Sequence, residues 1–104
     1  MSLSELEALL RRVCPDTYRE AAPEGLSRCV VWGQNDTAAL YGDDSAALIL
    51  PRVWIDIYTQ SHEDELPLCV IDALNEAGQP VGITGPEYLD KQLSLVVELS
   101  LTLV

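Results

Sequence analysis

The stretch Leu93–Val104, LSLVVELSLTLV, alternates between apolar and mostly polar residues with a period of two. Every odd position from 93 to 103 is leucine or valine, whereas serine, glutamate and threonine occupy most even positions. Successive side chains of a β-strand point to opposite faces of a sheet, so this pattern predicts a strand with one buried and one solvated face. A helix would scatter the same leucines around its circumference, which excludes a helix here.

A second two-faced strand is predicted at Arg52–Gln60, RVWIDIYTQ, and we expect it to lie beside the first in one sheet. Its odd positions from 53 to 57 are valine or isoleucine, whereas Trp54, Asp56 and Tyr58 share the other face. Large aromatic side chains on a second face indicate that this face is also covered, either by the chain itself or by a neighbouring subunit.

A first amphipathic helix is predicted near the start of the chain. Leucine or valine recurs at positions 6, 9, 10 and 13, which is helical spacing. Ser4 and Glu7 have the spacing of a capping box at its start, and Pro15 marks its end.

A second helix is predicted between the two strands, and its start has two alternatives. Ser61 can cap a helix whose first turn holds three acidic residues. Alternatively, the helix begins at Pro67, because proline suits the first turn of a helix and disrupts its interior. Gly78 is a suitable terminator in either case.

The remaining segments complete an α+β pattern over residues 1–104. Arg28–Gly33 and Pro80–Thr84 are predicted as short strands, the second followed by a turn region. Gln34–Pro51 has weak, alanine-rich arms around a turn, so it forms either a projecting hairpin or a loop. We therefore expect a single domain with a mostly antiparallel sheet of four to five strands and both helices packed on one face.

The composition limits the classes of function. The formal charge of −11, from 17 acidic and 6 basic side chains, argues against a surface that binds nucleic-acid phosphates. Three widely spaced cysteines suggest neither a disulfide framework nor a zinc site. The first residues lack the features of a signal peptide, and no apolar run approaches the length of a membrane span. We expect a soluble protein made inside the cell.

The chain offers few residues for catalysis. His62 is the only histidine, and pairing it with Cys69 on the second helix would leave both without an orienting partner. The acidic run Glu63–Glu65 lacks the spacing of a calcium loop and is explained by the helix dipole. The glycines at 78–85 do not form a phosphate-binding motif. The sequence therefore predicts no enzyme activity, no cofactor and no metal site.

Three segments together resemble the tail-terminator, or tail-completion, proteins of long-tailed phages and prophages. They are CVVWG at 29–33, RVWIDIYTQSHEDELPLCVIDALNEAG at 52–78, and LSLVVELSLTL at 93–103. In that family a strand of the V-x-I-x-I-Y kind runs into a helix with an acidic start, and the last strand alternates as it does here. The resemblance spans nearly the whole chain, although Pro67 and the alanine-rich segment at 37–50 depart from the family pattern.

The resemblance implies a structural virion protein that caps the finished tail tube as a ring, usually a hexamer, and presents the surface to which the head docks. Its partners would be copies of itself, the tail-tube protein and a head-completion or connector protein. It would be made in the host cytoplasm and reside in the virion tail. DNA would pass through a lumen lined with carboxylates without being bound.

The same resemblance suggests two sets of site residues. The predicted subunit-interface residues are Trp54, Tyr58, Leu99, Leu101 and Leu103. The predicted lumen or axial-face residues are Asp36, Asp43 and Asp44. Two alternatives to the tail terminator stay open, namely another ring or connector component of the same particle, and a small intracellular adaptor that binds one protein through a sheet edge.

Overall fold

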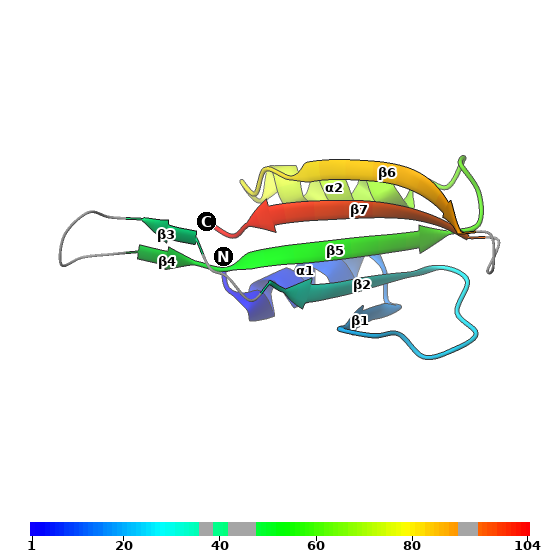
Figure 1. Ribbon diagram of the computed structural model, residues 1–104, viewed down its shortest axis with the longest axis horizontal. Coiled ribbons are helices and arrows are strands. Elements are labelled where there is room, and N and C mark those ends of the chain that lie inside the picture. Colours follow the sequence, from blue (N-terminus) through cyan, green and yellow to red (C-terminus); the bar gives the residue numbers. More distant parts are fainter. Residues whose placement is uncertain (36–38, 42–47, 90–93) are drawn as a thin grey trace.

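The computed structural model describes residues 1–35, 39–41, 48–89 and 94–104. Within these ranges the chain forms two helices and two sheets (Figure 1). The elements are α1 Leu3–Val13, β1 Thr17–Arg19, β2 Cys29–Gln34, β3 Ala39–Tyr41, β4 Leu48–Leu50, β5 Arg52–Thr59, α2 Leu66–Glu76, β6 Gly82–Leu89 and β7 Ser94–Thr102.

The main sheet has the strand order β1-β2-β5-β7-β6. Only the β1–β2 pair is parallel, and the other pairs are antiparallel. Figure 1 shows both helices behind this sheet, on the same face. The structure therefore confirms the predicted α+β class with a mostly antiparallel sheet.

The strand β7 lies inside the sheet, with β5 on one side and β6 on the other. Thr59 pairs with Leu95 and Arg52 with Thr102, so β5 and β7 are aligned along their whole lengths. The odd-numbered side chains of β7 from 95 to 101 are buried, whereas Glu98 and Ser100 are exposed. The predicted two-faced strand is confirmed, and so is its place beside β5.

The hydrophobic core lies between the helices and the sheet. Each helix contributes buried leucine or valine side chains at helical spacing, which directs one face of the helix to the sheet. Full burial of each such side chain stabilises the fold by about 1.5–3 kcal/mol. The core residues are Leu6, Leu9, Leu10, Cys14, Val30, Trp32, Val53, Ile55, Ile57, Leu66, Val70, Leu74, Val97, Leu99, Leu101 and Leu103.

The helix α1 starts two residues earlier than predicted. Ser2 is its N-cap and forms the capping box with Glu5, in place of Ser4 and Glu7. The earlier start adds Leu3, which packs against the core, and this burial favours the longer helix.

The helix α2 follows the second of its two predicted alternatives. It begins at Leu66, so Pro67 lies in the first turn, where its missing N–H costs no helical hydrogen bond. The Leu66 N–H donates to Asp64 Oδ1 at 2.9 Å. Asp64 also accepts two hydrogen bonds from Arg28, at 2.7 and 3.0 Å. This ion pair joins the residue before β2 to the start of α2.

The strands β1 and β6 differ from the sequence-based expectation. Residues 17–19 form a short parallel strand between α1 and β2, where no strand is predicted. The strand β6 continues to Leu89, through the residues predicted as a turn, because its pairing with β7 shifts register between Thr84 and Glu87. Gly85 makes this shift possible, because it has a φ of +105° and a Cβ there would lie 2.8 Å from the Val96 carbonyl oxygen.

Within the segment 34–51, β3 and β4 pair as antiparallel strands, with Ala39 opposite Leu50. This is the hairpin alternative of the prediction. Figure 1 shows the pair extending beyond one end of the main sheet.

A buried amide side chain ties the end of β7 to the residues after α2. Gln79 is buried, its Nε2 donates to the Val104 carbonyl oxygen at 2.9 Å, and its Oε1 accepts from the Val104 N–H at 2.8 Å. Both ends of one amide are therefore satisfied by one residue 25 positions away.

We expect Gln79→Met to lower the free energy of unfolding by about 1 kcal/mol, because it removes these hydrogen bonds and keeps the volume of the side chain. Urea denaturation checks this value. Gln34→Met, at an exposed position on β2, is the control and should change stability by less than about 0.5 kcal/mol. Equal losses in the two variants would contradict the proposed role of Gln79.

Candidate functional site

The sheet face that carries no helix is the candidate site, and we call it the open face. Strand register arranges its residues in three rows that run across β2, β5 and β7. The rows are Cys29–Tyr58–Val96, Val31–Asp56–Glu98 and Gly33–Trp54–Ser100. Aromatic, acidic and small residues therefore lie side by side on one surface.

The chain covers part of the open face itself. Because β1 and β2 are parallel neighbours, the connection at 20–28 must return along the sheet, and it lies against the open face. Cys29 and Val31 beneath it are only 3% and 6% exposed. Trp54, Asp56 and Tyr58, farther from the connection, are half-buried. The predicted cover over this face is therefore partly supplied by the chain.

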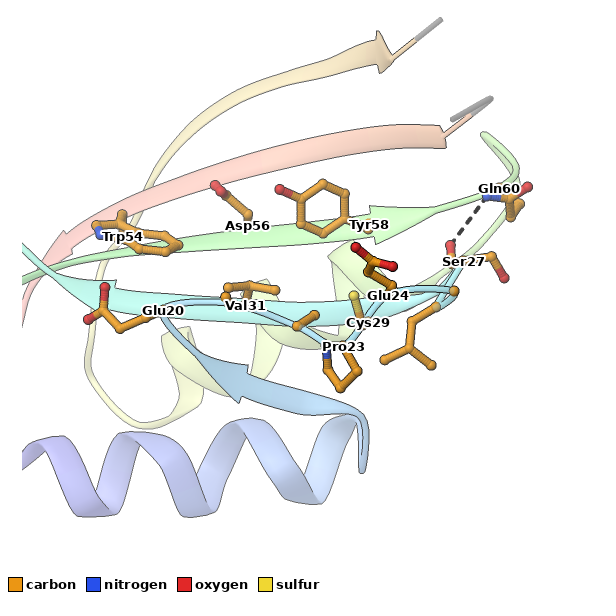
Figure 2. A pocket seen from close by; sticks show the side chains of 14 residues that line it. Glu20, Pro23, Glu24, Ser27, Cys29, Val31, Trp54, Asp56, Tyr58 and Gln60 are labelled. Atoms are coloured by element: carbon orange, nitrogen blue, oxygen red, sulfur yellow. Dashed lines mark hydrogen bonds between the residues drawn. The ribbon is translucent and has the colours of Figure 1, made fainter. Parts of the chain in front are cut away.

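An open groove of about 730 Å³ lies between the connection and the open face. Figure 2 shows Trp54, Asp56 and Tyr58 in a row along β5 on one side of it, with Glu20, Pro23 and Glu24 on the other. The Gln60 Nε2 group donates to the Ser27 carbonyl oxygen at 3.4 Å and links the two sides. The residues lining the groove are Glu20–Ser27, Cys29, Val31, Trp54, Asp56, Tyr58 and Gln60.

The indole of Trp54 packs on Gly33, its partner on β2. A Cβ atom at position 33 would lie 2.6 Å from Trp54 Cε2 and 2.9 Å from Nε1, closer than van der Waals contact allows. Glycine at this position therefore lets the indole lie flat against the sheet. It fixes the aromatic side chain at one end of the groove.

Two carboxylates face each other at the centre of the open face. Asp56 pairs directly with Glu98 across β5 and β7, an arrangement that is destabilising for like charges. Burial, and then the charge of Glu98, raise the pKa of Asp56. Burial raises the pKa of Tyr58 as well, with a further contribution from Asp56. The charge of Asp56 therefore lowers the stability of the folded state.

The structure divides the predicted interface residues into two groups. Trp54 and Tyr58 lie on the open face, where a partner can reach them. Leu99, Leu101 and Leu103 are core residues instead, buried beneath the helices. Leu99 and Leu101 also belong to β7, which is paired on both edges, so neither these buried side chains nor that strand edge can bind a neighbour. Asp36, Asp43 and Asp44 lie outside the described residues.

Other features of the open face were missed by reasoning from the sequence. Glu98 was visible as a polar residue on β7, but its position opposite Asp56 depends on strand register. The connection at 20–28 gave no periodic signal, although Pro23 and Gly25 near a strand marked it as a loop.

The residues considered for catalysis or metal binding do not gather at a site. His62 and Cys69 are both exposed. Cys14, Cys29 and Cys69 are free thiols. In the part of the chain that the structure describes, no group of three or more His, Cys, Asp or Glu side chains is arranged to hold a metal ion. Neither described helix is long and apolar enough to span a membrane.

Neither the protein-family models nor the curated proteins compared with this chain give a match. The chemistry of the site therefore has to be argued from its own geometry. Aromatic ring faces and carboxylates provide cation–π contacts and charge-assisted hydrogen bonds. The arrangement is suited to recognising a partner on the open face.

We expect Gly33→Ala to displace the Trp54 indole and to lower the free energy of unfolding by about 1–3 kcal/mol, because the added methyl overpacks the contact. The two tryptophans give two indole N–H signals by NMR, and the Trp54 signal should shift most. Gly82→Ala is the matched control on β6, where the nearest atom is the Ser100 hydroxyl, which can rotate away. An unmoved Trp54 signal in Gly33→Ala would contradict the packing described.

We expect Asp56→Asn to raise the free energy of unfolding at pH 7 by up to about 1 kcal/mol, because it removes the like-charge pair with Glu98. With the folded pKa of Asp56 raised, the folded chain binds more protons than the unfolded chain, so this group lowers stability as pH rises from about 4 through its folded pKa. The gain in the free energy of unfolding should be complete above the folded pKa of Asp56 and should vanish below about pH 4.

Urea denaturation across this pH range measures the effect. Asp72→Asn, at an exposed position on α2, removes the same charge from the helix layer and is the control. If the two substitutions stabilise the protein equally, the effect belongs to the net charge of the chain and the pairing of Asp56 with Glu98 is not its cause.

Proposed function

We propose that this protein is a structural virion component that caps the tail tube of a long-tailed phage as a ring and offers the head its docking surface. The observation that supports this most directly is the half-buried pair Trp54 and Tyr58 on a sheet face without helices. Half-buried aromatic side chains on a rigid strand are typical of protein interfaces. The family resemblance of the sequence supplies the kind of assembly.

The sheet offers a place for ring contacts other than β7. Its two edge strands are β1, with three residues, and β6, with eight. The edges are unlike, and a contact between unlike surfaces joins subunits head to tail, which closes into a ring when the rotation fits. The first half of β6 is regular and carries Ile83, which is 56% exposed. We assign the ring contact to this edge.

The charge of the chain supports the proposed passage of DNA. A ring of subunits with a formal charge of −11 each repels phosphates, so a genome can pass without adhering. Asp36, Asp43 and Asp44 remain the proposed lumen or axial-face residues.

A small intracellular adaptor is the second candidate, and the free edge of β6 favours it too, because an extended segment of a partner can add to a sheet edge. The two functions differ in stoichiometry. A ring needs several copies of the chain, whereas an adaptor binds one partner as a monomer.

Light scattering across a range of concentrations, alone and with tail tubes from the phage or prophage that encodes the protein, tests the proposal. We expect hexamers, either free or at one end of the tubes in electron micrographs. Ile83→Glu should reduce hexamer formation at least tenfold by placing a charge at the β6 edge. Leu68→Glu, at a 61% exposed position on α2, is the control and should leave assembly intact. A protein that stays monomeric and does not bind to tail tubes would favour the adaptor.

A further inference from the structure

The groove beside the open face combines an apolar floor with acidic walls. Cys29, Val31 and the rings of Trp54 and Tyr58 form the floor. The fourteen described residues that line the groove include three carboxylates and no basic side chain. These carboxylates are Glu20, Glu24 and Asp56, and Glu98 lies next to Asp56 on β7. We call this surface the acidic groove.

The carboxylates of the acidic groove take no part in the ion pairs of the described chain, which are Glu7–Arg11 and Arg28–Asp64. Arg19 stacks on the Trp32 ring at 4.9 Å from its centroid. Arg19, before the connection at 20–28, and Arg28, at its end, are therefore engaged with other partners. The negative charge of the acidic groove is left for a ligand to neutralise.

A second copy of the chain is a poor occupant for this groove. The chain has only 6 basic against 17 acidic side chains, so a second copy offers few cations to the carboxylates of this groove. A segment with positive charge, in contrast, would be attracted by the carboxylates and could stack on the aromatic rings. Charge complementarity thus selects a basic partner.

We propose that the acidic groove binds an extended segment of a partner protein that carries lysine or arginine, with one cationic head group above Asp56 between Trp54 and Tyr58. Alternate residues of a strand lie about 6.6–6.8 Å apart. A cation above Asp56 is therefore within reach of both flanking rings and of Glu98. The inference rests on the open face alone and does not require a ring.

The electrostatics of the groove support this assignment. Asp56 and Glu98 repel one another, and burial raises the pKa of Asp56. A cation placed between them reverses the sign of the interaction and stabilises both charges. The tight contact of Trp54 with Gly33 holds this aromatic ring of the floor in place before binding, which reduces the entropy lost on binding.

The test uses the full chain and a ten-residue peptide with arginine at alternate positions. The lysine version of the peptide and a version with neutral citrulline are compared with it. We expect the arginine and lysine peptides to shift the NMR signals of Trp54 and of the neighbouring amides on β5. The citrulline peptide should bind at least tenfold more weakly, because it keeps the shape of arginine and lacks the charge.

Paired variants locate the binding site. Asp56→Asn with Glu98→Gln should weaken binding of the arginine peptide at least tenfold, and relief of like-charge repulsion keeps this variant folded. Asp72→Asn with Glu76→Gln removes equal charge from exposed positions on α2 and should weaken binding less than threefold. Tyr58→Leu keeps every carboxylate and should weaken binding three- to tenfold through loss of the aromatic face.

Several results would overturn the proposal. Equal weakening by the two double variants would show attraction to net charge alone. Equal binding of the citrulline peptide would remove the role of the cation. Open-face signals that shift with protein concentration in the absence of peptide would identify a second copy as the occupant. Light scattering on the same samples reports assembly separately, so failure of the ring and failure of the groove are distinguishable.

Discussion

The structure depends on the burial of one side of β7 in the middle of the sheet. This strand is hydrogen-bonded to β5 and β6, and its odd-numbered side chains lie beneath both helices. The backbone polar groups of the strand are thus paired while its apolar face is dry, and both conditions are needed for a buried strand. Because β5 is aligned with β7 residue for residue, this burial also turns Trp54, Asp56 and Tyr58 to the opposite face.

A second constraint comes from the parallel pairing of β1 and β2. Two parallel neighbours cannot be joined by a tight turn, so the chain needs a crossing connection. The helices occupy one side of the sheet, and the connection at 20–28 lies on the other. It covers β2 and stops short of β7, which produces a groove instead of a closed second core. The acidic and aromatic residues lie where this cover ends.

The strands β5 and β7 could be predicted because the alternation of apolar and polar side chains along each of them shows which face is buried. The alternation in β5 and β7 requires one dry face, whatever the neighbours are. The strand β1 and the second half of β6 could not be predicted in this way, since the first is short and the second contains Gly85 and Pro86, and both depend on a partner strand. Similarly, both Ser2 and Ser4 precede a glutamate by three positions, and only the packing of Leu3 decides between them.

The site was predictable only in part, for a related reason. The second face of β5 was visible in the sequence, whereas the place of a strand in the sheet order was not. The sequence therefore predicts Leu99, Leu101 and Leu103 at an interface, whereas the structure buries all three and pairs β7 on both edges. The Asp56–Glu98 pair is likewise a product of register between segments more than thirty positions apart.

The ion pair between Arg28 and Asp64 connects the segment that borders the groove to the start of α2. Arg28 follows the last residue of the groove wall, and Asp64 also holds the first N–H of α2. The hydrogen bond from Arg28 lowers the pKa of Asp64, so its contribution to stability is present at neutral pH and is lost only in acid, as pH falls below about 4 through the lowered value. Protonation of Asp64 would weaken its hydrogen bonds to Arg28 and to the Leu66 N–H at the same time. The connection at 20–28 and the first turn of α2 would therefore become less stable together.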